Sequence, residues 1–142
     1  MEKPLQRLLL IEDHIPLARM TAELLREAGL EVRVAISAEE ALRVAAVFLP
    51  EIVLCDMFLP DMSGIEVARA LRARPEMKNV FFGIHTGMDV LRLEDIVSSV
   101  KINMILPKPL TPTKIAELLA ENAKLRPNPA EEPDTRIEVL NP

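Results

Sequence analysis

Short apolar runs that alternate with segments of helical periodicity constrain the fold more than any other feature. Each run stops abruptly at a polar or acidic residue, as a buried strand of a parallel sheet does. Between the runs, apolar residues recur at helical spacing, which predicts a helix after every strand. The predicted strands are RLLLI (7–11), EVRVA (31–35), EIVLC (51–55), NVFFGI (79–84) and INMIL (102–106).

Capping residues indicate where several of these helices begin and end. Ser37 and Ser63 each precede a glutamate by three residues, which is the spacing of a capping box. Thr111 is followed by a proline, as at the start of a helix. Gly29 suits a helix C-terminus, because glycine adopts the left-handed backbone conformation found there. A further helix is predicted over residues 88–100.

Strands that alternate with helices predict βαβ units, and therefore a parallel sheet with helices on both faces. The expected fold is a three-layer, doubly wound α/β domain with a five-stranded sheet. A length of 142 residues fits one such domain. Its expected limits are residues 1–125, followed by a proline-rich acidic tail or linker over residues 126–142. Within this tail, RIEVL (136–140) suits either a short strand or the start of a missing element.

Composition and charge exclude several kinds of protein. The formal net charge of −5 argues against a nucleic-acid-binding face, which needs clustered Lys and Arg. The apolar runs are too short to span a bilayer, and the N-terminus lacks the pattern of a signal peptide. Cys55 is the single cysteine, which excludes an internal disulfide and a multi-cysteine metal site. We therefore expect a cytoplasmic protein without membrane or direct nucleic-acid contacts.

Polar residues follow the predicted strands at the points where the strands end. Glu12 and Asp13 follow the first strand. Asp56 follows the third strand, Thr86 the fourth and Lys108 the fifth. Doubly wound sheets bind ligands outside the carboxyl ends of the strands, where the strand order reverses. In the flavodoxin-like order 2-1-3-4-5, the first and third strands flank this point. The carboxylates, the hydroxyl and the ammonium group are therefore expected to converge there.

The clustered residue types predict phosphoryl chemistry. Three carboxylates repel one another and favour a hard divalent cation with oxygen ligands, most naturally Mg²⁺. That cation and Lys108 can together neutralise an incoming phosphoryl group. Asp56 can act as the nucleophile and form an aspartyl phosphate, a reaction that depends mainly on positioning and charge neutralisation. Thr86 can donate a hydrogen bond to a phosphoryl oxygen, and the small Gly87 leaves access beside it.

The same residues lie in motifs that resemble the receiver domain of two-component response regulators, and the similarity covers residues 7–125. The motifs are IEDH (11–14), LCDMFLPDMSG (54–64), HTG (85–87) and PKP (107–109). The resemblance implies that Asp56 accepts a phosphoryl group from a histidine kinase or a histidine phosphotransfer protein. It also implies that Lys108 binds this group, with a cis peptide bond to Pro109. Thr86 would move towards the phosphoryl group, and a downstream protein or output domain would respond.

The resemblance further implies the metal ligands and the kind of activity. Asp13, Asp56 and the backbone carbonyl of Phe58 would bind Mg²⁺ directly. Glu12 would reach the ion through a water molecule. Family members often form homodimers, so a homodimer is a further expectation. The protein is not expected to be an enzyme beyond self-phosphorylation from small donors and slow autodephosphorylation.

Several positions depart from the usual pattern of the family, among them Lys101 and Ile102, which replace the usual Gly-Ala before the fifth strand. The aromatic residue that usually acts as a switch lies three residues before the lysine, and here it is Ile105. An aliphatic side chain cannot copy the rotamer switch of Tyr or Phe, so the signal should be read differently. Phe58 and Met88 would lie over the phosphoryl group. We expect their bulk to slow autodephosphorylation, because a water molecule must approach there.

Two other functions fit parts of the pattern. A phosphatase of the haloacid dehalogenase type also uses an aspartate nucleophile, but it needs a second aspartate two residues later, where this chain has Phe58. An interaction module of receiver fold that is no longer phosphorylated is compatible with Ile105 in place of the aromatic switch. His14, His85 and Cys55 lie near the predicted site and are expected to take no part in its chemistry.

Overall fold

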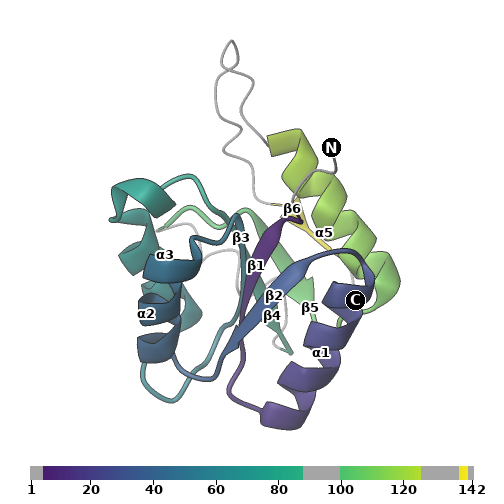
Figure 1. Ribbon diagram of the computed structural model, residues 1–142, viewed down its shortest axis with the longest axis horizontal. Coiled ribbons are helices and arrows are strands. Elements are labelled where there is room, and N and C mark those ends of the chain that lie inside the picture. Colours follow the sequence, from purple (N-terminus) through teal and green to yellow (C-terminus); the bar gives the residue numbers. More distant parts are fainter. Residues whose placement is uncertain (1–4, 88–99, 126–137, 141–142) are drawn as a thin grey trace.

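The computed structural model describes residues 5–87, 100–125 and 138–140. Its centre is a parallel sheet with the strand order β2-β1-β3-β4-β5-β6. Helices lie on both sides of this sheet, as Figure 1 shows. The strands are β1 (Arg7–Ile11), β2 (Glu31–Ala35), β3 (Ile52–Asp56), β4 (Phe81–Thr86), β5 (Met104–Pro107) and β6 (Glu138–Val139).

The helices cover the two faces of the sheet in pairs. They are α1 (Ile15–Glu27), α2 (Ala38–Phe48), α3 (Gly64–Arg72) and α5 (Pro112–Leu125), with a short 3-10 helix, η1 (Pro75–Met77). α1 and α5 pack on one face, and α2 and α3 pack on the other (Figure 1). The helix predicted over residues 88–100 falls almost entirely outside the described residues. No helix in the described ranges is long and apolar enough to cross a membrane.

The first five strands confirm the predicted doubly wound topology and the order 2-1-3-4-5. All neighbouring strands among them pair in parallel. The structure adds a sixth strand, β6, which comes from the predicted tail and pairs with β5. The order reverses between β1 and β3, so the carboxyl ends of these two strands flank the expected ligand site.

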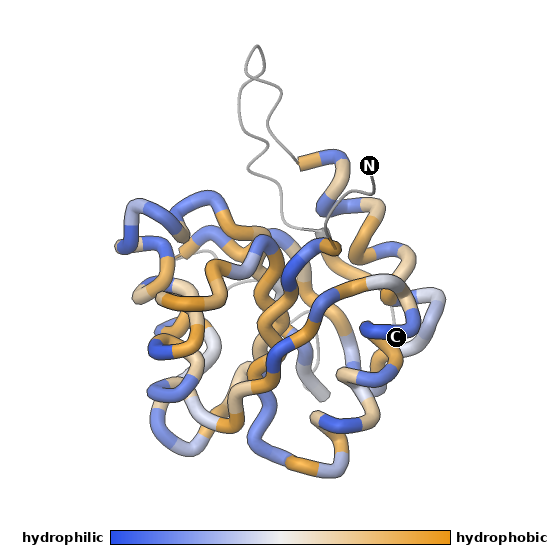
Figure 2. Tube along the Cα trace, in the orientation of Figure 1, coloured by the Kyte–Doolittle hydropathy of each residue, from blue (hydrophilic) through white to orange (hydrophobic). Residues whose placement is uncertain are grey.

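The central strands are apolar on both faces because helices cover both faces. Leu8 and Leu10 of β1 belong to the core beneath α1 and α5, whereas Leu9 and Ile11 belong to the core beneath α2 and α3. All four side chains are fully buried. Figure 2 shows the hydrophobic residues concentrated along these strands. The alternation across β1 therefore anchors both helical layers to the strand that carries the first acidic pair.

The predicted capping residues lie at the predicted helix ends. Ser63 and Glu66 form a reciprocal capping box at the start of α3. The hydroxyls of Ser37 and Thr111 accept backbone N–H groups in the first turns of α2 and α5. Gly29 follows α1 with a φ of 94°, a conformation that glycine adopts at little cost. The caps at Ser63 and Thr111 fix where the β3–α3 and β5–α5 loops, which carry site residues, end.

The fourth strand begins and ends two residues later than predicted, at Phe81 and Thr86. Its last residues are polar, but they remain in the sheet because strands continue on both sides of them. His85 pairs with Asp56 of β3, and Thr86 pairs with Pro107 of β5. Thr86 is therefore the last residue of the strand, whereas the apolar pattern had ended the strand before it.

Candidate functional site

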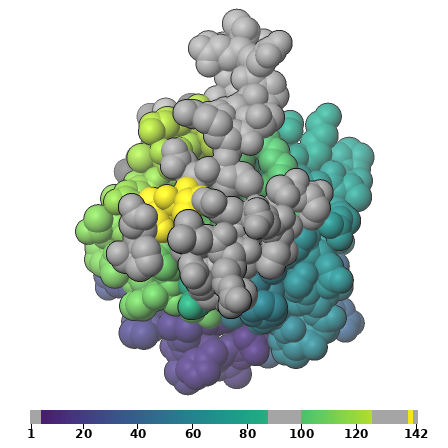
Figure 3. Space-filling model, turned by 180° about the vertical axis from the view of Figure 1, so that it is seen from behind, coloured from purple at the N-terminus to yellow at the C-terminus, as the bar shows by residue number. Residues whose placement is uncertain are grey.

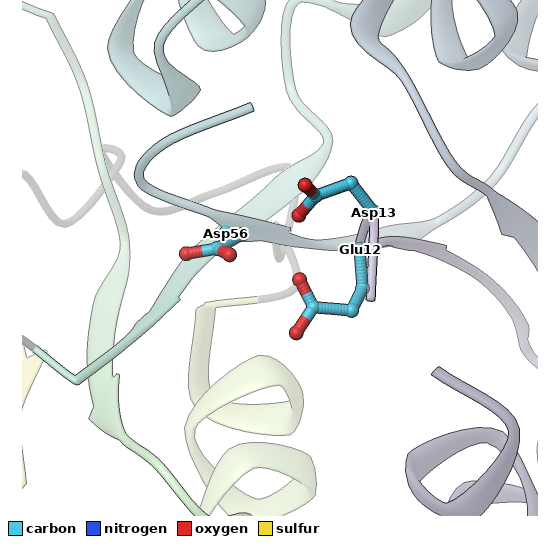
Figure 4. Close-up of side chains that lie close together, drawn as sticks. All are labelled: Glu12, Asp13 and Asp56. Atoms are coloured by element: carbon cyan, nitrogen blue, oxygen red, sulfur yellow. The ribbon is translucent and has the colours of Figure 1, made fainter. Parts of the chain in front are cut away.

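Three carboxylates meet where the strand order reverses. Glu12 and Asp13 follow directly after β1, and Asp56 is the last residue of β3. One oxygen from each carboxylate lies within 4.8 Å of the others. Figure 4 shows the three side chains converging from the ends of the two neighbouring strands. Glu12 is buried, Asp56 is half-buried and Asp13 is exposed, so the cluster can be reached from one side.

Lys108 joins this cluster from the loop after β5. Its Nζ lies 2.7 Å from Oε1 of Glu12 and 3.0 Å from Oδ2 of Asp56. The peptide bond between Lys108 and Pro109 is cis, as expected. The backbone N–H of Lys108 donates to the carbonyl oxygen of Thr86 at 2.9 Å. One ammonium group therefore contacts two carboxylates, and the backbone beside it is joined to the end of β4.

Burial and the hydrogen bonds between Glu12 and Lys108 act in opposite directions on the pKa of each residue. Burial raises the pKa of Glu12, and the hydrogen bond from Lys108 offsets only part of this effect. Burial alone would lower the pKa of Lys108, but its hydrogen bonds to the two carboxylates outweigh burial, so the pKa is raised. Lys108 therefore keeps its charge, and Glu12 is harder to ionise than an exposed glutamate.

The donor set fits a hard divalent cation. Oε2 of Glu12 is buried and has no hydrogen-bond partner within the described residues. Lys108 contacts two of the three carboxylates, Glu12 and Asp56, so the cluster carries more negative charge than one ammonium group balances. Oxygen ligands in such a cluster are those that Mg²⁺ prefers. The predicted metal ligands Asp13 and Asp56 are therefore brought together as a cation site requires.

The loop between β3 and α3 folds tightly beside the cluster. Phe58 and Ser63 form an isolated antiparallel bridge within this loop. The N–H of Gly64 donates to the carbonyl oxygen of Met57 at 2.7 Å, which closes one end of the bridge. The Phe58 side chain is 58% exposed. The bridge therefore fixes the Phe58 backbone two residues after Asp56 and leaves the ring at the surface.

Asp61 holds the same loop against α2, a contact that the sequence analysis missed. Its carboxylate accepts the N–H of Ala38 at 3.0 Å and the N–H of Glu39 at 2.9 Å. These hydrogen bonds lower the pKa of Asp61. The partners lie 23 and 22 residues away along the chain, so no local pattern indicates the contact. Asp61 thereby ties the loop that carries Phe58 to the start of a neighbouring helix.

Lys114 is a second positioning residue without a sequence signal. It lies in the first turns of α5, and its Nζ donates to the carbonyl oxygens of Pro107 and Pro109 at 3.3 and 3.1 Å. These two carbonyls flank Lys108 on either side. One side chain therefore braces both ends of the short segment that presents the Lys108 ammonium to the carboxylates.

The residues expected to be bystanders occupy structural positions. Nδ1 of His14 accepts the N–H of Leu17 at 3.2 Å and caps α1. Cys55 is fully buried, and burial raises the pKa of its thiol. His85 is also buried, and burial lowers its pKa to about 4, so the ring is neutral near neutral pH. None of these positions suggests a nucleophile or a metal ligand.

The residues expected to transmit a signal are buried where they are described. Thr86 is 2% exposed and Ile105 is fully buried in β5. Ile105 belongs to the core beneath α2 and α3. Met88, which was expected to lie over the phosphoryl group, is outside the described residues. An aliphatic residue therefore fills the position of the usual aromatic switch as part of the packed core.

Gly64→Ala is expected to destabilise the domain. A Cβ at this position would lie 2.6 Å from the backbone oxygen of Asp56 and 2.9 Å from Cδ1 of Ile84. Relief requires a backbone shift next to Asp56, which we expect to lower the free energy of unfolding by about 1–3 kcal/mol. A Cβ at Gly87 would meet nothing within 4 Å, so Gly87→Ala is the matched control. Denaturant titrations that give both variants equal stability would contradict this close approach.

Comparisons with known proteins identify the family to which the fold belongs. The family model of the response regulator receiver domain matches residues 8–120. The transcriptional activator protein ExaE of Pseudomonas putida is 43% identical over 89 residues, which cover 60% of this chain and 41% of the relative. The DNA-binding response regulator MtrA of Mycobacterium tuberculosis is 33% identical over 95 residues, which cover 59% and 42%. The chain thus spans about two fifths of the length of these relatives.

A sensor protein and two solved structures extend the comparison. The sensor protein TorS of Escherichia coli is 33% identical over 124 residues, covering 86% of this chain and 13% of TorS. A receiver domain protein of Methanospirillum hungatei gives a TM-score of 0.72 at 28% identity, covering 85% of this chain and 98% of that one. The receiver domain of a Pseudomonas aeruginosa sensor histidine kinase, solved with a coordinated magnesium ion, gives 0.76 at 22% identity, covering 84% and 99%.

The family model spans most of the chain, and the fold and strand order agree with it. The chain therefore belongs to the response regulator receiver domain family, whose members act in two-component systems.

Proposed function

We propose that this chain is a phosphoacceptor signalling domain and that Asp56 is the residue that receives the phosphoryl group. The contact of Lys108 with both Asp56 and Glu12 carries this proposal. Asp56 is the half-buried member of the acidic cluster and lies at the carboxyl end of β3. Asp56 is therefore accessible to a phosphoryl donor, and its carboxylate is paired with Lys108.

The transfer requires little chemistry from the protein beyond positioning and charge. An oxygen of the Asp56 carboxylate attacks the phosphorus of a phosphohistidine. The P–N bond breaks, and the imidazole nitrogen keeps the electron pair and takes up a proton. Lys108 then faces the new phosphoryl oxygens instead of the free carboxylate. Thr86, at the end of the neighbouring β4, would donate its hydroxyl to one of them.

A magnesium ion would neutralise the negative charge of the carboxylates and the phosphoryl group that Lys108 does not balance. Asp13, Asp56 and the Phe58 carbonyl would hold the ion, and Glu12 would reach it through a water molecule. Glu12 has a buried oxygen without a hydrogen-bond partner within the described residues, which supports this assignment. The solved relative from Pseudomonas aeruginosa has magnesium in its active-site cleft, and the donor set here has the same chemical requirement.

The partners follow from the proposed chemistry. The donor would be a histidine kinase or a histidine phosphotransfer protein, and the receiver of the signal would be a downstream protein or an output domain. The relatives ExaE and MtrA are described as a transcriptional activator and a DNA-binding response regulator. We place the chain among proteins that store a phosphoryl group, not among enzymes that turn over a substrate, apart from self-phosphorylation and slow autodephosphorylation.

Acetyl phosphate treatment tests the function directly. The protein is incubated with and without Mg²⁺, and its intact mass and elution profile are measured. We expect one phosphoryl group per chain, added only with Mg²⁺. If no phosphoryl group is added and beryllofluoride with Mg²⁺ also fails to bind, the proposal is wrong. The chain would then be a phosphorylation-independent interaction module.

Phe58→Asn is expected to shorten the lifetime of the aspartyl phosphate severalfold. The Phe58 ring lies at the surface two residues after Asp56, where a large apolar group restricts the approach of water. An amide would admit water and orient it. Val47 of α2 is 79% exposed, so Val47→Asn serves as a control for the loss of a surface hydrophobe. A lifetime as long in Phe58→Asn as in the wild type would refute the shielding role.

A further inference from the structure

The tail of the chain returns to the sheet as β6. Glu138 and Val139 pair in parallel with Met104 and Ile105 of β5. The N–H of Leu140 also donates to the carbonyl oxygen of Ile105 at 3.2 Å. Figure 3 shows residues 138–140, in yellow, at the surface beside the green residues of the C-terminal half. β5 is therefore not the free edge of the sheet.

β6 extends both cores of the domain across this edge. Val139 packs against the core beneath α2 and α3, and Leu140 packs against the core beneath α1 and α5. Met104 and Ile105, the residues that pair with β6, are fully buried. The edge of β5 is thus a site that accepts one parallel strand with an apolar residue for each face, because successive side chains of a strand point to opposite faces.

Within one chain, the crossover connection from β5 to β6 has the unfavourable handedness. β3 and β4 are neighbours in the sheet, and their connection passes through α3, on the face of α2. The step from β5 to β6 runs in the same direction across the sheet, but α5 lies on the opposite face. It is therefore a left-handed crossover, whereas about 98% of parallel crossovers are right-handed.

The pairing is also small. Only two residue pairs form the ladder, and Val139 and Leu140 remain half-buried. Residues 126–137 separate the end of α5 from β6, and an extended chain covers about 3.4 Å per residue. This connection can therefore reach about 40 Å, far beyond the roughly 10 Å between packed layers. A short ladder on a long connection can be exchanged at little cost.

We propose that the edge of β5 is a strand-binding site for a second copy of this chain, in which residues 138–140 of each copy pair with β5 of the other. The same residues that fit β5 within one chain fit it between chains. The hand of the crossover no longer matters when the strand comes from another molecule. The exchange is symmetric and closes as a dimer. It involves the start of β5 and does not depend on the phosphoryl chemistry proposed at its far end.

Sedimentation of the full chain over a wide concentration range tests the exchange. We expect the wild type to form a dimer as its concentration rises and Val139→Asp to remain a monomer, because a carboxylate cannot enter the core that receives Val139. Leu140→Pro, which removes the N–H that Ile105 accepts, should also remain a monomer. Val47→Asp, at an exposed position of α2, should dimerise like the wild type. A wild type that stays monomeric throughout would overturn the proposal, as would dimers of Val139→Asp and Leu140→Pro.

A disulfide trap separates strand exchange from any other dimer. Met104→Cys and Glu138→Cys are made in separate chains, mixed and oxidised. Since the two positions are Cα partners in the parallel register, this mixed disulfide is the one expected when β6 of one copy lies on β5 of the other. We expect this product, and we expect Leu140→Pro in the Glu138→Cys chain to reduce it at least tenfold. Its absence in dimer-forming conditions would refute the exchange. Acetyl phosphate labelling of Val139→Asp reports separately on the proposed function.

Discussion

Asp56→Asn is expected to abolish covalent phosphorylation by acetyl phosphate. The amide nitrogen and oxygen of asparagine cannot replace a carboxylate as nucleophile, because the amide oxygen carries no negative charge to attack phosphorus. The remaining carboxylates cannot substitute for it. Glu12 is buried against Lys108. Asp13 follows β1 and not β3, so it does not occupy the position of Asp56. Intact-mass measurement after incubation with acetyl phosphate and Mg²⁺ should show only unmodified protein.

The control for this variant is Glu117→Gln, which makes the same change of a carboxylate to an amide on the exposed side of α5. It should be phosphorylated to the same extent as the wild type. Circular dichroism should show that both variants fold. Phosphorylated Asp56→Asn protein would show that another residue is the acceptor, and peptide mapping would then identify it.

Most of the candidate site could be predicted because it follows from topology. Glu12, Asp56 and Lys108 lie far apart in the sequence, but each ends a strand or follows one. Parallel strands place all their carboxyl ends at one edge, so the position of a polar residue relative to its strand determines where it lies. Apolar patterning and capping residues were sufficient to define those strands, although the ends of β3, β4 and β5 shifted by one or two residues.

The remaining contacts could not be predicted, because they join distant residues through geometry that leaves no local pattern. Asp61 precedes a helix, so its position suggests a cap for α3, yet it binds the start of α2. Lys114 has the spacing of an ordinary surface lysine but braces the loop around Lys108. RIEVL was compatible with a strand, whereas its partner β5 and its parallel direction depend on the whole sheet.

Lys108→Met is expected to change two measurements in opposite directions. Phosphorylation by acetyl phosphate should slow by about 100-fold, because a charged group that faces the transferring phosphoryl oxygens is lost. Mg²⁺ should bind about tenfold more tightly. The ammonium group lies 2.7 Å from Glu12 and 3.0 Å from Asp56, where it repels the cation and occupies its ligands. Methionine keeps much of the side-chain volume and removes the ammonium group, with its charge and its hydrogen bonds to Glu12 and Asp56.

The opposite signs distinguish a charge that assists transfer from a residue that merely supports the fold. A collapsed site would lose both phosphorylation and Mg²⁺ binding. Loss of the ammonium group alone slows phosphoryl transfer and tightens Mg²⁺ binding. Mg²⁺ should also raise the stability of Lys108→Met, because a cation that binds the folded state stabilises it. Lys124→Met is the matched control, since Lys124 lies on α5 and contacts Glu121 at 2.9 Å. Calorimetric titration that shows weaker Mg²⁺ binding in Lys108→Met than in this control would contradict the assigned role of Lys108.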